Sequence, residues 1–185
     1  MNKRYLFFDV ECANCFNGKG KLCSFGYVLT DENFNIIIKE DRLINPKSKW
    51  DWYVVKKMLG YPKSEFESKP GFDKEYPFIK ELLENPEYLV FGSGISNDIK
   101  HLKDDCERYG LPEIEFVSRD VQNLYSRYKE EKEKKSLTKM ARELEIDCQA
   151  LKEHISRNDA EITMLITKAV CERLNSAAHD LISKL

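Results

Sequence analysis

The sequence lacks any long hydrophobic run. None of its apolar stretches approaches the roughly 18 residues that a membrane-spanning helix needs, and the opening MNKRYLFFDVE has no signal-peptide cleavage region. We therefore expect residues 1–185 to form a single cytoplasmic domain with no membrane partner. The C-terminal Ser183-Lys184-Leu185 is a peroxisomal address in a eukaryote, but the Lys-, Glu-, Ile- and Asn-rich composition leans toward a bacterial source.

The chain also lacks a strong charge of either sign. Its 30 Lys and Arg residues against 32 Asp and Glu residues give a formal net charge of −2. This balance argues against the long basic surface with which proteins bind nucleic-acid duplexes. It leaves open a pocket lined by metal ions that admits only a few nucleotides.

A regular cysteine pattern is missing as well. The 6 cysteines are scattered along the chain, which is typical of reduced thiols in a cytosolic protein rather than of a disulfide framework. Cys12 and Cys15 form a C-x-x-C pair, which is how many zinc sites begin. Because neither a second such pair nor a nearby histidine completes it in the sequence, we expect no zinc there.

What the chain does contain is an apolar stretch that ends in two acids, residues 4–11 with the sequence RYLFFDVE. Its aromatic and β-branched residues favour a buried central strand, where an unpaired carboxylate is costly. Side chains alternate along a strand, so Asp9 and Glu11 point to one face, about 6.6 Å apart. The pair is either half of a site for a hard cation or a strand end that meets solvent.

The rest of the chain alternates predicted strands and helices. We expect a loop over residues 12–21, strands over residues 22–30, 34–43, 88–91 and 113–118, and helices over residues 52–59, 76–83, 98–109, 120–129, 136–144 and 159–174. The first three strands read as an antiparallel meander. This order indicates one α/β domain with a mixed sheet.

Residues 45–76 are interrupted by prolines and glycines and are rich in aromatic rings. Such rings either stack on nucleotide bases or pack an irregular stretch onto the sheet. We expect packing for the five rings Trp50, Trp52, Tyr53, Phe66 and Phe72.

Two more acids stand at positions that suit a site. Asp98 follows a glycine turn at the carboxyl end of a predicted strand, where open α/β sheets bind their ligands. Asp159 lies near the start of the last helix, shortly after His154. Each acid alone is more simply explained as a helix cap or a first-turn acid, so the set has to be considered together.

As a set, these residues resemble the DEDDh family of 3′–5′ exonucleases over nearly the whole chain. The matching positions are Phe8-Asp9-Val10-Glu11, Asp98 and His154-Ile-Ser-Arg-Asn-Asp159, with further similarity at Ser24-Phe25-Gly26 and in the spacing from Gly60 to Pro70. The resemblance implies an α/β, ribonuclease H-like fold, with a five-stranded mixed sheet flanked by helices. It also implies release of nucleoside 5′-monophosphates from the 3′ ends of single-stranded DNA or RNA.

The resemblance further implies a role for each acid in binding two Mg²⁺ or Mn²⁺ ions, which an all-oxygen ligand set suits. Asp9 would bridge both ions, and Glu11 and Asp159 would complete the first site. Asp98 would hold the second ion, largely through water. His154 would be the general base that deprotonates the attacking water.

The chain departs from the family pattern around the terminal nucleotide. Many proofreading members carry His-Asn where this chain has Ser93-Gly94, and a histidine where it has Leu59. We therefore expect the pocket around the terminal nucleotide to differ from theirs. We expect backbone groups directly after Glu11, at Cys12 and Ala13, to contact the terminal sugar. Because the chain ends soon after its last predicted helix, without a long polymerase-docking tail, we expect a stand-alone nuclease.

Two other functions compete with this prediction. A catalytically idle module that only binds nucleic acid or a partner has no reason to keep all the functional positions filled. A hydrolase that uses Asp9 as a phosphoryl-accepting nucleophile would show D-x-D rather than D-x-E, and it gives His154 no role. For the predicted nuclease, the sequence does not separate DNA from RNA as the substrate, because a contact to the 2′-OH is not identifiable in it.

Overall fold

The computed structural model describes residues 3–178, so Ser183-Lys184-Leu185 lies outside the described residues. Its five strands are β1 (Arg4–Asn14), β2 (Lys21–Thr30), β3 (Ile36–Leu43), β4 (Tyr88–Gly92) and β5 (Ser118–Asp120). They form one mixed sheet in the order β3-β2-β1-β4-β5. The first three are antiparallel neighbours, whereas β4 runs parallel to β1 and β5 parallel to β4. The predicted meander and the five-stranded mixed sheet are confirmed.

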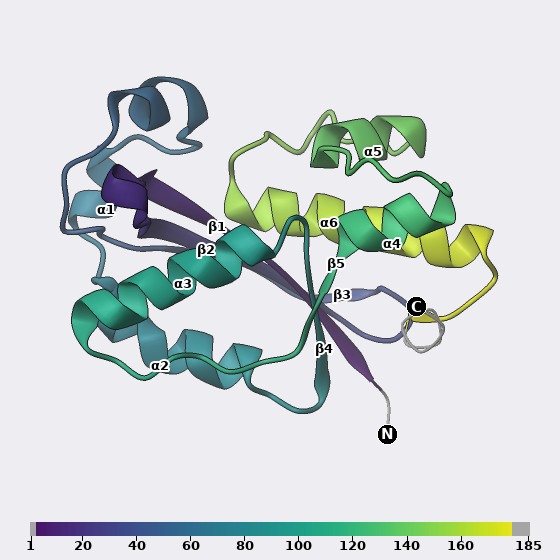
Figure 1. The fold of residues 1–185 in the computed structure, drawn as a ribbon, viewed down its shortest axis with the longest axis horizontal. Helices are drawn as coiled ribbons and strands as arrows, with labels where there is room; N and C mark the ends of the chain where they lie inside the picture. Colours follow the sequence, from purple (N-terminus) through teal and green to yellow (C-terminus); the bar gives the residue numbers. More distant parts are fainter. Residues whose placement is uncertain (1–2, 179–185) are drawn as a thin grey trace.

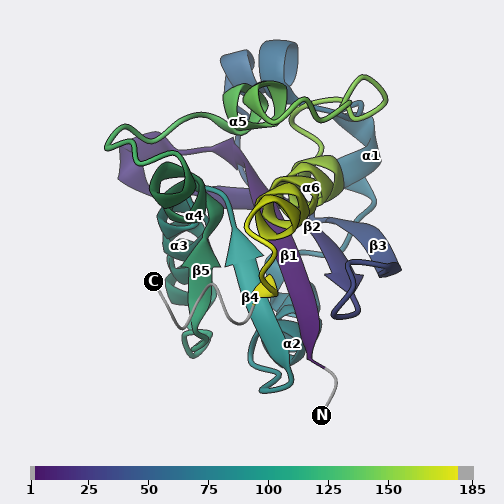
Figure 2. The same ribbon diagram turned by 90° about the vertical axis from the view of Figure 1, so that its right-hand side faces the viewer.

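Helices cover both faces of this sheet (Figures 1 and 2). They are α1 (Ser64–Glu67), α2 (Phe72–Leu83), α3 (Ser96–Tyr109), α4 (Val121–Tyr128), α5 (Leu137–Glu143) and α6 (Ser156–Arg173), with short helical turns η1 (Phe16–Gly18) and η2 (Val54–Met58). Helices α2 and α3 pack on one face, and α4, α5 and α6 share the core of the other. Among residues 3–178, none of the helices combines the length and apolar character needed to cross a membrane.

The central strand β1 is buried on both sides, as its composition predicts. Tyr5 and Phe7 point into the core shared with α4, α5 and α6. Leu6 and Phe8, from the alternate positions, point into the core shared with α2 and α3. All four side chains are fully buried. Because the two faces alternate residue by residue, the acid at the next position after Phe8 belongs on the α6 side.

Where the structure differs most from prediction is the segment before β5. The predicted strand over residues 113–118 is wrong, since only Ser118–Asp120 pairs with β4. Ile114 is buried, and the Phe116 ring packs edge-on against Phe8, 5.8 Å between centroids. The alternating apolar residues of this segment, Ile114 and Phe116, are therefore buried against the sheet without being a strand. The residues that pair with β4 come later, at Ser118–Asp120.

Several boundaries also shift. β1 continues to Asn14, through residues that were expected to form a loop, with irregular pairing to β2 after Glu11. Helix α2 begins at Phe72 rather than at Tyr76, with Gly71 as its extended N-cap. Because the pairing becomes irregular after Glu11, β1 can bend there and continue to Asn14 instead of ending at Glu11.

The aromatic residues between β3 and α2 divide into two groups. Phe66 and Phe72 are buried, and Trp50 packs edge-on against Phe66 with 5.1 Å between ring centroids. The packing predicted for Trp52 and Tyr53 is wrong, because these side chains are 67% and 56% exposed. They lie directly before the helical turn η2, whose N-cap is Tyr53, and their side chains face solvent.

Candidate active site

The second acid-bearing element, α3, is joined directly to β1. Pairing between β4 and β1 ends at Phe7, so the β1 backbone beyond it has no strand neighbour on the β4 side. There Asp98 Oδ1 accepts a hydrogen bond from the N–H of Val10 at 3.1 Å. Gly94, with a φ of +64°, makes the turn that leads from β4 into α3. Asp98 is therefore held against the same part of β1 that carries Asp9.

The start of α6 sits unusually close to β2. A Cβ atom on Gly26 would lie 2.0 Å from the backbone nitrogen of Arg157, so only glycine allows this approach. The Ser156 hydroxyl donates a buried hydrogen bond to Ser24 Oγ at 2.9 Å. This contact explains the resemblance at Ser24-Phe25-Gly26 in physical terms. It directs the first turn of α6, and with it Asp159, toward the end of β1.

His154 reaches the acids from the loop before α6. Its backbone has a φ of +59°, a conformation that few residues other than glycine adopt. Its backbone N–H donates to Asp159 Oδ2 at 3.1 Å, and its Nδ1 lies 3.4 Å from Glu11 Oε1. Ligand-type atoms of these three residues all lie within 4.8 Å of one another. The strained backbone is thus held in place by the site that it completes.

The electrostatics of the cluster are dominated by buried negative charge. Burial and the neighbouring carboxylates Asp98, Glu11 and Asp159 raise the pKa of Asp9 well above its usual range. Burial raises the pKa of Asp98 to about 7, and burial together with the Glu11 charge raises the pKa of Asp159 to about 7. The hydrogen bond to Glu11 raises the pKa of His154.

The donor set fits a hard divalent cation. Asp9 Oδ2 is a buried oxygen with no hydrogen-bond partner in the described part of the chain, and such a group is costly unless a ligand satisfies it. Four carboxylates in one place also repel each other. A cation with oxygen ligands would relieve both costs, and Mg²⁺ and Mn²⁺ have that preference.

A cavity of about 530 Å³ opens over these residues. Asp9, Glu11, His154 and Asp159 line it, whereas Asp98 approaches the cluster from the β4 side. Lining residues that the sequence did not mark as part of a site are Gln122, Ser136, Leu137, Thr138 and Glu153. They come from α4, α5 and the loops around them, and no local motif identifies them.

The structure thus brings together all four predicted acids and His154. Cys12 and Ala13 lie in the last part of β1, directly after Glu11. The Ala13 carbonyl, however, already accepts a hydrogen bond from Asp51 N–H at 2.9 Å. Any contact of these two residues with a terminal sugar stays a prediction.

The five-stranded mixed sheet with helices on both faces is an α/β fold that this chain shares with solved nuclease structures. No protein-family model matches the sequence, and no curated protein matches it either. The identification of the fold therefore rests on solved structures with the same architecture.

Three similar structures are 3′-exonucleases or exonuclease I. A 3′-exonuclease that recognises the 3′ end of a histone mRNA stem-loop has a TM-score of 0.79 at 14% identity, covering 96% of this chain and 65% of its own. The nuclease domain of 3′hExo, a DEDDh family member bound to rAMP, has a TM-score of 0.77 at 15% identity, covering 96% and 94%. E. coli exonuclease I in complex with a dA16 oligonucleotide has a TM-score of 0.76 at 16% identity, covering 94% and 42%. At these identities the likeness establishes a shared fold.

Proposed function

We propose that this chain is a metal-dependent 3′–5′ exonuclease of the DEDDh family, which removes nucleoside 5′-monophosphates from single-stranded nucleic acid. The observation that carries the proposal is the convergence of four carboxylates and one imidazole at the end of the central strand. These side chains belong to Asp9, Glu11, Asp98, His154 and Asp159. Their occurrence on the fold of known exonucleases supports the same conclusion.

The carboxylates would hold two Mg²⁺ or Mn²⁺ ions. The resemblance to the family implies that Asp9 would serve both ions, and its buried Oδ2, which has no hydrogen-bond partner among the described residues, is available to a cation. Glu11 and Asp159 would complete the first site, and Asp98 would serve the second. When bound, two such ions stabilise the attacking and the leaving oxygen of a phosphoryl displacement.

The chain's own contribution to the reaction is proton transfer and positioning. His154 is held through Nδ1 by Glu11 and through its backbone by Asp159. Its side chain is 41% exposed, so a proton taken from the attacking water can pass on to solvent. The water oxygen bonds to phosphorus, the bond to the leaving O3′ breaks, and that oxygen acquires a proton. The product is a nucleoside 5′-monophosphate, with the chain of the substrate shortened by one nucleotide.

The exposed rings of Trp52 and Tyr53, just before η2, offer a surface for bases. The Asp51 N–H is bonded to the Ala13 carbonyl, which ties the segment before η2 to the end of β1. Trp52 and Tyr53 project from this segment into solvent, and the Lys56 ammonium lies 4.8 Å from the Trp52 ring centroid. Base stacking on such rings is worth about 1–3 kcal/mol and tolerates any sequence. We therefore assign the nucleotides next to the 3′ end to this surface.

The test is digestion of 3′-labelled DNA and RNA oligonucleotides, short and long, with Mg²⁺ or Mn²⁺. Mononucleotide release is expected from the native chain and from Glu32→Ala, a control that removes an exposed acid in the β2–β3 turn. Asp9→Ala should release none. If the folded native chain binds the oligonucleotides but cleaves neither polymer with either metal, the chain is an idle binding module and the proposal fails.

A further inference from the structure

A second cluster of ligand-type side chains lies beside the end of β1, on the α3 side. Cys12 belongs to β1, Cys15 follows it at the turn into η1, and His101 comes from the first half of α3. One ligand atom from each of the three lies within 4.8 Å of the other two. The nuclease reaction described above uses none of these side chains. The missing histidine of the C-x-x-C pair is therefore supplied from a distant part of the chain.

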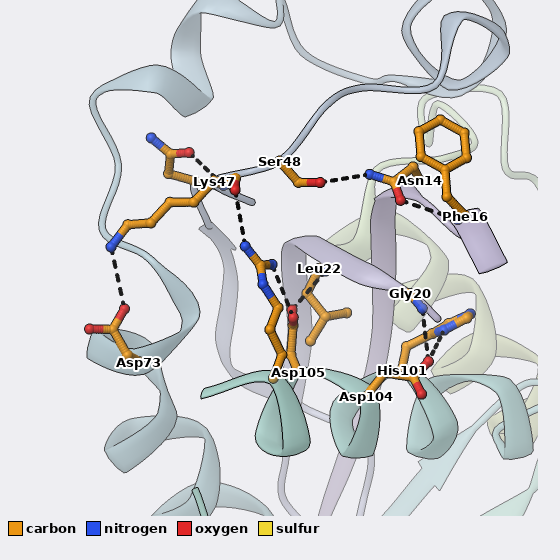
Figure 3. A network of polar contacts seen from close by, with 12 residues as sticks. Asn14, Phe16, Gly20, Leu22, Lys47, Ser48, Asp73, His101, Asp104 and Asp105 are labelled. Atoms are coloured by element: carbon orange, nitrogen blue, oxygen red, sulfur yellow. Dashed lines mark hydrogen bonds and ion pairs between the residues drawn. The ribbon is translucent and has the colours of Figure 1, made fainter. Parts of the chain in front are cut away.

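The two more buried members of the cluster, Cys12 and His101, both lie next to the backbone of Gly20. A Cβ atom on Gly20 would lie 2.3 Å from His101 Nδ1 and 3.0 Å from Cys12 Sγ. Glycine at this position leaves the space in which the imidazole and the thiol face each other. Figure 3 shows His101 beside Gly20, with Asp104 below both.

The imidazole nitrogen that faces this space is Nδ1 of His101, and the acid beside it is Asp104. His101 Nδ1 is buried without a hydrogen bond to any described residue. The nearest acid oxygen, Asp104 Oδ2, is 3.6 Å away, which is too far for a hydrogen bond. Asp104 Oδ2 instead accepts from the Gly20 N–H at 2.8 Å (Figure 3). It also accepts from the Lys100 ammonium at 2.8 Å. Asp104 is thus held by other groups, and its contact with Nδ1 is only the 3.6 Å ion pair drawn in Figure 3, which a closer ligand can replace.

The chemistry of the three side chains selects a soft or borderline cation. Two thiolates and one imidazole match zinc, in contrast to the all-oxygen cluster a few residues earlier. With Zn–S bonds of about 2.3 Å and a Zn–N bond of about 2.0 Å, tetrahedral geometry places ligand atoms roughly 3.5–3.8 Å apart. Small side-chain rotations bring atoms that already lie within 4.8 Å to these separations. Cys15 is exposed, which provides an entry path and a water for the fourth position.

We propose that Cys12, Cys15 and His101 bind a zinc ion that fastens the end of β1 to α3. The proposal goes beyond the nuclease activity and does not depend on it. The two elements that the ion would join each carry acids of the carboxylate site. Glu11 directly precedes Cys12, and Asp98 lies one helical turn before His101. The zinc ion would therefore be a structural support that maintains the distance between those acids.

A reversible disulfide between Cys12 and Cys15 is the competing explanation of the C-x-x-C pair. It would need neither the third side chain nor the glycine that makes room for it. It would also consume both thiols, so a count of free thiols distinguishes the two cases. Cys148, a partly buried cysteine that packs in the core of the α6 side, provides a matched control.

The experiment measures zinc bound per chain after the reduced, full-length protein is loaded with Zn²⁺ and freed of excess metal. The zinc held at this site is the amount that Cys15→Ser loses relative to its parent, and one equivalent of such zinc is expected for the native chain, for Cys148→Ser and for Asp9→Ala, which leaves the three ligands intact. Cys15→Ser and His101→Asn should weaken zinc binding at least tenfold. In the native chain, Co²⁺ in place of zinc should give a thiolate-to-cobalt charge-transfer band in the near ultraviolet, which carboxylate ligands do not produce.

Two results would overturn the proposal. One is zinc binding that Cys15→Ser and His101→Asn both leave unchanged while circular dichroism shows them folded. The other is a native chain that gives no thiolate-to-cobalt band although all its thiols are titratable, or that loses two free thiols to a Cys12–Cys15 disulfide under reducing conditions. The cobalt spectrum uses the native protein, so it decides the matter even where a variant fails to fold.

Discussion

The end of β1 presents two different sets of ligands on its two sides. Toward α6 it carries Asp9 and Glu11, which meet other oxygen ligands and an imidazole. Toward α3 it carries Cys12, which meets a second thiol and His101. Hard and soft ligands that are neighbours in the sequence are thus separated by the width of the strand.

This comparison shows how one strand presents different metal-ligand types on its two faces. Because successive side chains point to opposite faces, adjacent residues serve different sites without competing for one ion. The irregular pairing after Glu11 completes the separation by turning the strand toward η1 and α3. The oxygen side is electrostatically unfavourable without cations, as the raised pKa values of Asp9, Asp98 and Asp159 indicate. On the α3 side the ligand set is two thiols and the imidazole of His101, with no carboxylate among them, so it lacks this repulsion.

The largest predicted effect comes from breaking the oxygen side alone. Asp9→Ala should lower nuclease activity by about a thousandfold or more, since loss of a bridging ligand removes several kcal/mol of transition-state stabilisation. Its Tm in the absence of Mg²⁺ should equal or exceed that of the native chain, because a repelled, unpartnered carboxylate is gone. Activity assays and thermal melts measure the two quantities. A fall in Tm would show that Asp9 stabilises the fold directly.

The next prediction distinguishes the role of the His154 imidazole from the role of its backbone conformation. His154→Asn removes the proposed base but keeps a residue type that tolerates a positive φ. Activity should fall about a hundredfold, within the usual range for loss of a general base, while Tm changes little. His154→Ala serves as the contrast, since it adds backbone strain at this φ. Native-like activity of His154→Asn would exclude the imidazole from the reaction.

A smaller effect should follow from moving α6 away from the sheet. A Cβ on Gly26 would overlap the backbone of Arg157 and Ser156. Gly26→Ala should therefore cost about 1–3 kcal/mol, or roughly 3–10 °C in Tm, and reduce nuclease activity by displacing Asp159. Zinc binding on the α3 side should not change. Gly18→Asn is the control, because a Cβ atom on Gly18 would meet no described atom within 4 Å and asparagine tolerates its φ of +73°.

The smallest effect is a pH dependence of stability without divalent cations. Asp98 and Asp159 have folded-state pKa values of about 7, against roughly 4 in the unfolded chain. The folded state therefore binds more protons between these values, and its stability falls as the pH rises from about 4 to about 7. The raised pKa of His154 acts in the same direction, since its stabilisation is also lost at higher pH.

The measurement compares the Tm of the native chain with that of Asp98→Asn in chelator between pH 5 and pH 8. The native Tm should fall by roughly 3–6 °C more than the variant Tm over this range. Asparagine keeps the oxygen that accepts from the Val10 N–H, so only the titrating charge is removed. Parallel curves for the two proteins would show that Asp98 does not titrate in this range.

Much of the fold follows from local pattern. The apolar stretch of β1, the meander and the helix whose N-cap is Ser136 are each specified by residues close together in the chain. The acids of the site were identified because their types and order resemble those of a known family. The exposed Trp52 and Tyr53 were mispredicted, because an aromatic ring has the same local signature whether it packs inward or faces solvent.

By itself, the amino-acid sequence determined which side chains could bind a metal and which strand presents them, because strand alternation is a local property of the backbone. Only the tertiary structure decided which partners complete each set. The bond from Asp98 to the Val10 N–H, the close approach of α6 to Gly26 and the placement of His101 beside Cys12 all depend on how distant elements pack. Those contacts arise from burying apolar faces of helices on a shared sheet, and no short stretch of sequence encodes them.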